Sequence, residues 1–405
     1  FEFTQTKLRR EVLPVQYKLY SFDYEKFKSQ LVNVPIREEF TGVSNVVVSF
    51  PMPNGAIEEF RIIEASTFEK NLQNQFPEIR SFAGQGVTNP SNVIRFSVSP
   101  YNGLSALIRS GSEGTTFIID PISMDYKTVI VFDRIHTKKS GDFICTTEDA
   151  VQQFGQVLDR NADNNVVLNN ADDGVLRRFR MAQSCTAEYA NYFGATSAAQ
   201  VNLVLAAFNA TYTRCNAIFE MDFNATMVLI ANTTSVIYYN AATDPYSPAS
   251  QLGNWNNELQ TTLTNVIGNA NYDIGHLFGA TGGGGNAGCI GCVCNTGKGS
   301  GYTSPADGIP MGDNFDVDYV AHEIGHQLGA NHTFTHSREN NTVNYEPGGG
   351  STIMAYAGIT NFNLQDFSDD YFHAGSIAQV QANMTSKTCD VETALTHGVP
   401  VVGAG

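Results

Sequence analysis

The 405-residue sequence has few basic residues, few histidines and no long apolar run. Lys and Arg total 24 against 40 Asp and Glu, and the net charge of −16 argues against nucleic acid or an anionic membrane as the partner. No stretch of about 18 apolar residues occurs, so no membrane span is expected. The opening FEFTQTKLRR lacks the apolar core of a secretion signal, which leaves a cytosolic protein or one already trimmed.

Three of the eight histidines stand in the run HEIGHQLGANH at 322–332. We expect a helix over 318–328, where His322 and His326 lie one turn apart and can reach one metal ion. Glu323 projects from the rim of the same face. The opposite face is apolar and predicts contact with a core. It carries Val320, Ile324 and Leu328.

The sequence also offers residues that suit the two ends of this helix. Asp316 and Asp318 suit the N-terminus, where carboxylates complement the helix dipole and cap free N–H groups. Gly329 suits the C-terminus, because glycine accepts the left-handed backbone that turns the chain sharply. The turn brings His332 around as a third ligand.

Three neutral imidazoles predict a catalytic zinc site, Zn²⁺ being the expected cofactor, with water at the fourth position. Glu323, too far along the helix to bind the ion directly, is then the general base that takes the proton of that water and passes it to the leaving amine. The expected reaction is amide hydrolysis. The alternatives are a structural zinc site or a core helix that happens to carry histidines.

HExxHxxGxxH followed by STIMAYAG at 351–358 resembles the metzincin metalloendopeptidases. The resemblance implies that Met354 forms a hydrophobic floor beneath the zinc, and that Tyr356 approaches the metal or stabilises the oxyanion. Thr333 departs from the Asp, Glu, Ser or Pro that follows the third ligand in the main families. Through YVAHEIGHQLGANHTF, YEPGGGSTIMAYAG and SDDYFH the chain is most similar to secreted bacterial reprolysin-like (adamalysin-like) enzymes.

Six of the seven cysteines lie beyond residue 180, where three disulfides are expected in a secreted enzyme. Cys145 is left over, and we interpret it as a cysteine switch whose thiolate occupies the fourth zinc position in a latent form. The alternative is a buried free cysteine. Similarity to adamalysin-like domains implies a bridge from Cys294 to Cys389, and Cys185 with Cys215 is a further suggested pair.

The N-terminal part reads as a β-rich prodomain of stacked hairpins, with one helix at 23–35 that Pro35 ends. No catalytic constellation occurs in it, so inhibition and assisted folding are the expected roles, with an independent binding module as the alternative. The expected strands are 44–50, 58–65, 93–100, 104–110, 115–121 and 127–134.

The C-terminal part alternates strands and helices ahead of the zinc helix, which predicts an open, mostly parallel α/β sheet. The resemblance to the metzincins implies that a substrate peptide adds to the exposed edge of this sheet. His276, on one of these strands, is interpreted as structural. The expected elements are strands at 177–191, 227–231 and 272–278 and helices at 201–218 and 251–267.

GGGGNAG at 282–288 contains GxGxxG, but cysteines follow it where a nucleotide site needs a helix. A flexible rim loop clipped by disulfides is the expectation, with the cysteines of CIGCVC paired and not bound to metal. Acidic clusters at 307–318 and 366–370 are compatible with Ca²⁺, which the sequence does not specify.

These observations predict a secreted zinc endopeptidase held latent by its own prodomain, acting on protein or peptide substrates. The alternative is an inactive binding or adhesion protein on a metzincin scaffold, against which Glu323 argues, because only catalysis needs a base there. The expected divisions are an inhibitory prodomain at 1–149, an exposed linker with the activating cleavage at 150–176, a metzincin catalytic domain at 177–395, and at 396–405 the start of a linker to a further module.

Overall fold

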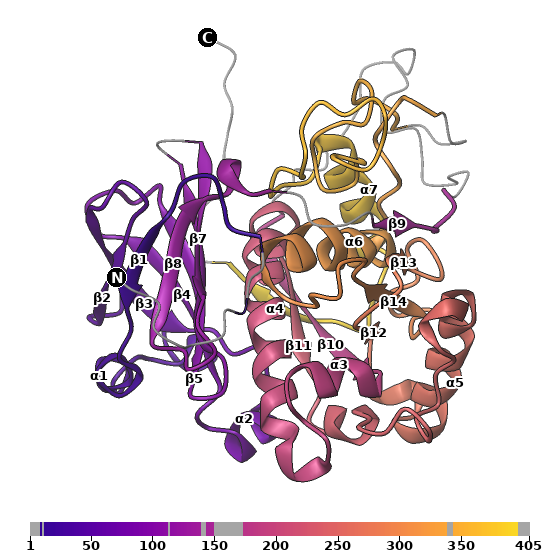
Figure 1. Cartoon of the computed structure of the whole chain (residues 1–405), viewed down its shortest axis with the longest axis horizontal. Helices are drawn as coiled ribbons and strands as arrows, with labels where there is room; N and C mark the ends of the chain where they lie inside the picture. Colours follow the sequence, from indigo (N-terminus) through magenta and orange to yellow (C-terminus); the bar gives the residue numbers. More distant parts are fainter. Residues whose placement is uncertain are drawn as a thin grey trace.

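The computed structural model describes residues 9, 12–111, 114–138, 143–149, 173–337 and 343–395. It has a β-rich N-terminal part and a mixed α/β C-terminal part, which lie on opposite sides of the long helix α4, Val201–Phe223 (Figure 1). The expected linker up to residue 172 and the expected C-terminal linker lie outside the described residues.

The N-terminal part is one eight-stranded antiparallel sheet in the order β1-β8-β7-β6-β5-β4-β3-β2. Strands β2 to β8 pair consecutively, so the expected hairpins join into a single meander, and β1 closes it against β8. One face packs on α1 around a phenylalanine-rich core. The strands are Lys18–Ser21, Val47–Pro51, Ile57–Glu64, Arg80–Gly86, Val93–Ser99, Gly103–Ser110, Thr115–Pro121 and Thr128–Asp133.

All six expected strands of this part are present, and the prediction of a β-rich N-terminal region is confirmed. Two strands were missed: β1 is short, and β4 contains small and polar residues that give little β signal. The expected helix at 23–35 is only one and a half turns long, α1 at Tyr24–Ser29, and α2 at Lys70–Gln75 was not expected.

The C-terminal sheet is ordered β11-β10-β12-β14-β13-β9, with β15 also paired to β10. β11, β10, β12 and β14 run parallel, whereas β13 is antiparallel to β14 and β15 is antiparallel to β10. The expected parallel strand direction is therefore present in the central strands of the sheet, whereas β13 and β15 run antiparallel to their neighbours. The strands are Ile144–Cys145 (β9), Val175–Cys185 (β10), Ala225–Leu229 (β11), Ile274–Phe278 (β12), Gly284–Asn286 (β13), Gly301–Ser304 (β14) and Val391–Ala394 (β15).

The run at 282–288 is not the flexible rim loop that its glycines suggest. It contains strand β13, which pairs on one side with β14 and on the other with β9. Glycine lowers strand propensity, but it also allows another backbone or a buried side chain to approach closely, and tertiary contacts outweigh the local preference here.

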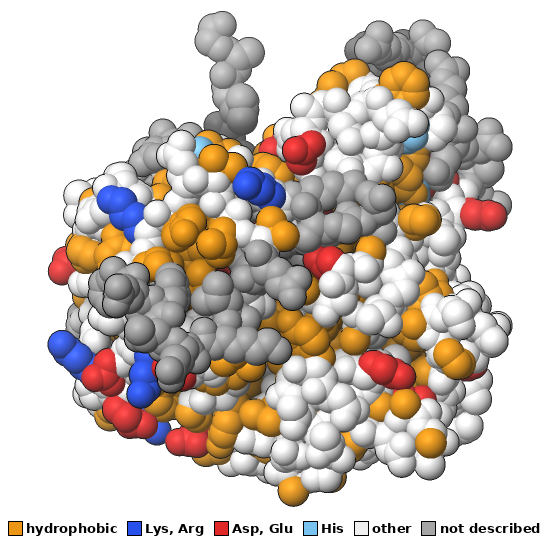
Figure 2. All heavy atoms as spheres, viewed as in Figure 1, with side chains coloured by type: hydrophobic (Ala, Val, Ile, Leu, Met, Phe, Trp, Pro, Cys, Tyr) orange, Lys and Arg blue, Asp and Glu red, His pale blue; other side chains and the backbone are white. Residues whose placement is uncertain are grey.

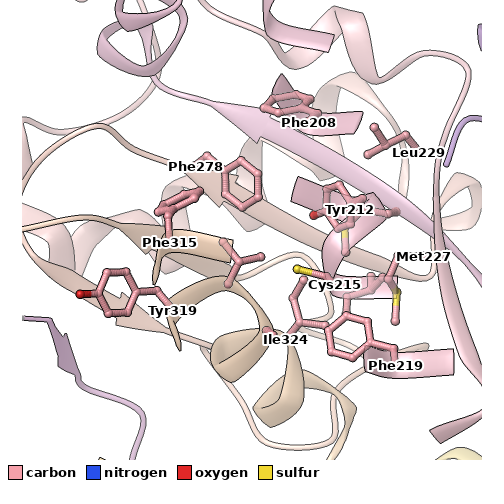
Figure 3. Packing of buried hydrophobic residues seen from close by; sticks show 14 of the residues in the cluster. Phe208, Tyr212, Cys215, Phe219, Met227, Leu229, Phe278, Phe315, Tyr319 and Ile324 are labelled. Carbon is pink, nitrogen blue, oxygen red and sulfur yellow. The ribbon is translucent and has the colours of Figure 1, made fainter. Parts of the chain in front are cut away.

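Helix α4 is buried on almost every face because it contacts the N-terminal sheet on one side and the C-terminal core on the other. Figure 3 shows its residues Phe208, Tyr212, Cys215 and Phe219 packed with side chains of β11, β12 and the segment that leads into the zinc helix. The other α-helices described in the C-terminal part are the short α3 (Ala187–Tyr192) and the longer α5 (Trp255–Val266), α6 (Ala321–Leu328) and α7 (Ala374–Met384).

The contact between the two parts is strongly charged. Arginines of the N-terminal part mostly face carboxylates of the C-terminal part. The exposed Lys and Arg side chains seen in Figure 2 also lie over the N-terminal part. Arg134, for example, is 3% exposed and lies 2.9 Å from Asp318. The other pairs in this direction are Arg37 and Arg95 with Glu220, and Arg109 with Asp222 and Asp370; Arg214 with Asp120 and Arg178 with Glu38 run the opposite way.

Candidate metal centre

The helix of the HExxH run is preceded by a π-helical segment, η7 at Asn314–Val320, which continues into α6. Every residue of α6 is buried, so the helix lies inside the molecule rather than along its surface. Gly329 ends it at φ 128°, with its N–H donating to the carbonyl oxygens of Gly325 and His326, as the sequence predicted.

The expected capping by Asp316 and Asp318 is wrong. Both residues lie within η7, and neither side chain caps the helix. Asp316 instead accepts hydrogen bonds from Thr211 and Arg214 of α4, and Asp318 accepts two from Arg134. Buried arginines compete for these carboxylates more strongly than free N–H groups do, because an unpaired buried charge costs several kcal/mol.

The structure brings His322, His326, His332 and Cys145 together. One donor atom from each lies within 4.8 Å of all the others, and all four residues are buried. The Nε2 atoms of His326 and His332 are 3.1 Å apart, and the Cys145 sulfur lies 3.7 Å from His326 Nε2. The group combines residues 145 and 322–332, which are far apart in the sequence.

Each imidazole is oriented by its other ring nitrogen. Nδ1 of His322 lies 2.6 Å from the carbonyl oxygen of Ile353, and Nδ1 of His326 lies 2.7 Å from that of Ala330. These contacts make Nδ1 the donor and direct the Nε2 lone pair toward the centre of the cluster. His332 is held differently, by the Asp149 carboxylate, 3.2 Å from its Nδ1.

The donor set fits zinc. Burial lowers the pKa of His322 to about 3 and lowers that of His326 well below its usual value, so both rings are neutral, as metal ligation requires. Nε2 of His322 is buried without a hydrogen-bond partner among the described residues, a cost that a bound cation removes. Burial also raises the pKa of Cys145 to about 11, so a thiolate there requires a cation.

Glu323 lies beside the cluster and is fully buried. Its Oε2 accepts a hydrogen bond from the Thr147 hydroxyl at 3.2 Å, and its Oε1 has no partner among the described residues. Burial raises the pKa of Glu323 to about 7, which suits a carboxylate that takes up and releases a proton near neutral pH.

Met354 and Tyr356 flank the histidines. Met354 is fully buried against α6, where a Cβ added to Gly325 would lie 2.7 Å from its sulfur, so glycine is needed for this close approach. The Tyr356 ring centre lies 4.7 Å from that of His332, and its hydroxyl donates to the carbonyl oxygen of Cys145 at 3.3 Å.

A buried carboxylate joins the third histidine to the turn that carries Met354. Glu346 accepts hydrogen bonds from the hydroxyls of Thr333 and Thr352 and from the N–H groups of Ser351 and Thr352, the latter two at 2.9 and 3.0 Å. Burial by itself raises the pKa of Glu346, but these bonds lower it overall. Thr333, the residue that departs from the family pattern, is thus one of the donors to Glu346.

Residues 143–149 cross the cluster as an extended segment whose side chains alternate between buried and exposed. Phe143 stacks on Tyr319 with ring centres 4.1 Å apart, and Cys145 and Thr147 point into the site. The backbone N–H groups of Ile144 and Thr146 donate to the carbonyl oxygens of Gly283, just before β13, and Gly285 within it, so the segment occupies the edge of the C-terminal sheet. It therefore fills the place where a peptide can add to that edge.

The disulfides agree only partly with the sequence expectations. Cys294 is bonded to Cys389, and Cys289 to Cys292, within a loop whose Gly291 N–H donates to the carbonyl of His326. The suggested pair is wrong: Cys185 and Cys215 are buried free thiols in the core, and Cys215 donates to the carbonyl of Asp316 at 3.2 Å. Three described cysteines are therefore free and buried, and Cys145 differs from Cys185 and Cys215 in lying beside the three histidines.

Sequence reasoning missed Thr147, Asp149 and Glu346. The first two share the face of Cys145 at the two-residue period of an extended chain, so a strand assignment there signals them. Glu346 has no such signal, because a loop of unpredictable path brings it to Thr333. His276, interpreted as structural, is indeed outside the cluster and lies within hydrogen-bond distance of Gln327 and Thr303.

A buried set of three histidines on HExxHxxGxxH, with a glutamate beside them on the same helix and a methionine turn beneath, defines the metallopeptidase class. A family model described as metallo-peptidase family M12B, reprolysin-like, matches residues 176–387, and the chain belongs to this family. The resemblance predicted from the sequence is confirmed. No curated protein matches the sequence. No helix within the described ranges is long and apolar enough to cross a membrane.

Proposed function

We propose that this protein is a secreted zinc endopeptidase held latent by its own N-terminal part. The observation that carries the proposal is the convergence of Cys145 with three histidine nitrogens within 4.8 Å, beside a buried glutamate. Family membership and the cluster support a zinc metallopeptidase. Catalytic competence, latency and secretion are the parts that we add.

His322, His326 and His332 are the residues that would hold the zinc, with Cys145 as the further ligand of the latent form. A zinc ion held there would supply Lewis acidity, which polarises the scissile carbonyl and makes water more acidic. Glu323 takes the proton released by water as it attacks and delivers it to the nitrogen of the departing amine. Its burial, with a pKa of about 7, suits both halves of this transfer.

The peptide substrate adds to the free edge of β13 once residues 143–149 have left it. Tyr356 then has a new partner: its hydroxyl, which donates to the Cys145 carbonyl in the latent form, donates to the carbonyl oxygen of the substrate instead. Met354 supports the histidine helix from below.

Latency follows from what the extended segment covers. Cys145 meets the histidines, Thr147 donates to Glu323, and the backbone takes the edge of β13, so the ligands, the base and the substrate site are occupied together. We propose residues 1–149 as the inhibitory prodomain and 177–395 as the catalytic domain. Two disulfides support a secreted location.

The decisive experiment for catalysis replaces Glu323 with glutamine, which keeps size and polarity but cannot take a proton. After activation, E323Q is expected to retain zinc and to lose peptide hydrolysis by roughly 10²–10⁴-fold. Zinc content by elemental analysis and cleavage of a quenched fluorescent peptide measure the two properties. Equal cleavage by E323Q, or by wild-type protein after chelation, would show that the proposed zinc site does not carry out the hydrolysis. No cleavage by activated, zinc-loaded wild-type protein would favour a binding protein on the same scaffold.

The experiment for latency compares C145A in the full chain with C215A, which also removes a buried free thiol but lies in the core of α4. C145A is expected to raise cleavage of the fluorescent peptide before any activating cut, whereas C215A stays as inactive as the wild type. Unchanged activity in C145A, with zinc bound and the fold intact by circular dichroism, would exclude the thiol as the latch.

A further inference from the structure

The three histidines of the cluster differ in where their second ring nitrogen finds its partner. His322 and His326 use carbonyl oxygens of the C-terminal part, Ile353 and Ala330. His332 instead faces Asp149, which belongs to the same extended segment as Cys145. One ligand of the site is therefore oriented by a residue from outside the expected catalytic domain.

Asp149 holds His332 at two points. A single carboxylate oxygen, Oδ1, lies 2.9 Å from the backbone nitrogen of His332 and 3.2 Å from its Nδ1. The Asp149 side chain is 1% exposed and that of His332 is fully buried, so water does not weaken the contact. The alternation that buries Cys145 and Thr147 also brings Asp149 to the site.

We propose that Asp149 is a positioning residue for the third zinc ligand, so that the segment which blocks the site also helps to build it. The inference rests on the proposed zinc site. A carboxylate that accepts from Nδ1–H fixes the imidazole tautomer with Nε2 free for the metal, sets the ring orientation and increases the basicity of the ligand.

The consequence is that zinc is bound in the latent form more tightly than the histidines alone would hold it. Metal loading then precedes activation, and release of residues 143–149 removes the Asp149 carboxylate along with the Cys145 thiol. Asp149 thus acts through His332, and it takes no part in the proton transfer assigned to Glu323.

The test compares D149A with E148A in the full-length chain. Glu148 is the neighbouring residue, also acidic but exposed, and serves as the matched control. The zinc dissociation constant is measured by competition with a chromophoric chelator. D149A is expected to raise it by about 10–100-fold, the usual effect of removing an outer carboxylate, while E148A leaves it unchanged.

Two further measurements distinguish positioning of His332 by Asp149 from a purely structural role of Asp149. D149N keeps an oxygen that can accept from His332 and is expected to fall between wild type and D149A in zinc affinity, and it decides the question if D149A does not fold. With Co²⁺ in place of zinc, D149A is expected to change the d–d absorption bands, whereas C145A removes the sulfur-to-cobalt charge-transfer band.

Each outcome has one meaning. If wild-type protein binds neither Zn²⁺ nor Co²⁺, the proposed zinc site itself fails. If wild type binds zinc and the folded D149A and D149N bind it as tightly as E148A does, with unchanged cobalt spectra, the positioning role of Asp149 is overturned while the zinc site stands.

Discussion

Burial acts on two ionisable side chains near α6 in opposite directions. It raises the pKa of Glu323 to about 7, because the carboxylate loses water, and it lowers the pKa of His276 to about 4, because the imidazolium loses water. At this pKa the Glu323 carboxyl group can both take up and release a proton near neutral pH, as the proposed function requires. His276 is kept neutral, with Nδ1 2.8 Å from Gln327 and Nε2 2.9 Å from Thr303 on β14.

His276 gives a prediction for the pH dependence of stability. Its folded-state pKa of about 4 is below the unfolded value of about 6.5, so the unfolded chain binds the additional proton between these limits. This contribution is complete above pH 6.5 and is lost as pH falls toward 4, and its size is on the order of 3 kcal/mol.

The variant H276N keeps a side-chain N–H for Gln327 but does not titrate. Urea unfolding at pH 7, 6 and 5 is expected to show wild type losing stability faster than H276N as pH falls. Parallel pH profiles for the two proteins would show that His276 does not contribute this dependence.

At the scale of elements, the histidine helix and the methionine turn are joined through loops rather than through regular structure. The N–H of Thr333, next to His332, donates to the carbonyl of Met354 at 3.1 Å, and Glu346 bridges Thr333 to the turn. A buried carboxylate with four donors is costly to remove because each donor is left unpaired.

We expect E346A to lower the free energy of unfolding by about 2–4 kcal/mol and to reduce kcat/KM of the activated enzyme. E346Q is the control: its oxygen keeps the two backbone donors and its amide can donate to the two hydroxyls, so most of the stability should remain. Chemical denaturation and peptide cleavage measure both effects. If E346A and E346Q are equally stable, the four hydrogen bonds do not hold the turn.

Elements also show where sequence patterns mislead. The helices and strands expected at 201–218, 227–231, 251–267 and 272–278 are present, because each has at least one face that must be buried. The strand expected at 177–191 is too long, because β10 ends at Cys185 and helix α3 begins at Ala187. The segment with Asp316 and Asp318 is predicted to start a helix, yet both residues lie inside the π-helix η7. Arginines from distant elements, Arg214 and Arg134, bind these carboxylates. Local signals do not include such partners.

At the scale of the whole molecule, the two parts meet through buried ion pairs. Arg134 donates to both oxygens of Asp318, at 3.0 and 2.9 Å, and to the carbonyl of Ser368. Asp318 lies in η7, directly before the histidine helix α6. The N-terminal part therefore contacts the segment that leads into this helix, in addition to covering the histidine cluster with residues 143–149.

Removing one partner of such a pair leaves a buried charge. We expect R134A to destabilise the full-length protein by about 3–5 kcal/mol, and the double variant R134A/D318N to recover part of that loss. Replacing the exposed Lys127 with alanine is the control and should change stability by less than about 0.5 kcal/mol. Additive effects of R134A and D318N in thermal and urea unfolding would show that the pair is not coupled.

The sequence by itself determined the arrangement of the three histidines, because HExxHxxGxxH is local: helical geometry and one glycine turn place His322, His326 and His332 with little help from the rest of the chain. The sequence also determined which part is β-rich and which is α/β, because the hydrophobic periodicity of strands and helices can be recognised within short stretches.

Only the tertiary structure decided which distant groups complete the site. Thr147 and Asp149 reach it because β9 pairs with β13, and the same pairing brings in Cys145, which the sequence had singled out only as the cysteine left over. Cys185 and Cys215 are free thiols buried in the core, although the sequence suggested that they pair. Contacts of this kind depend on how whole elements pack, and no local pattern encodes that packing.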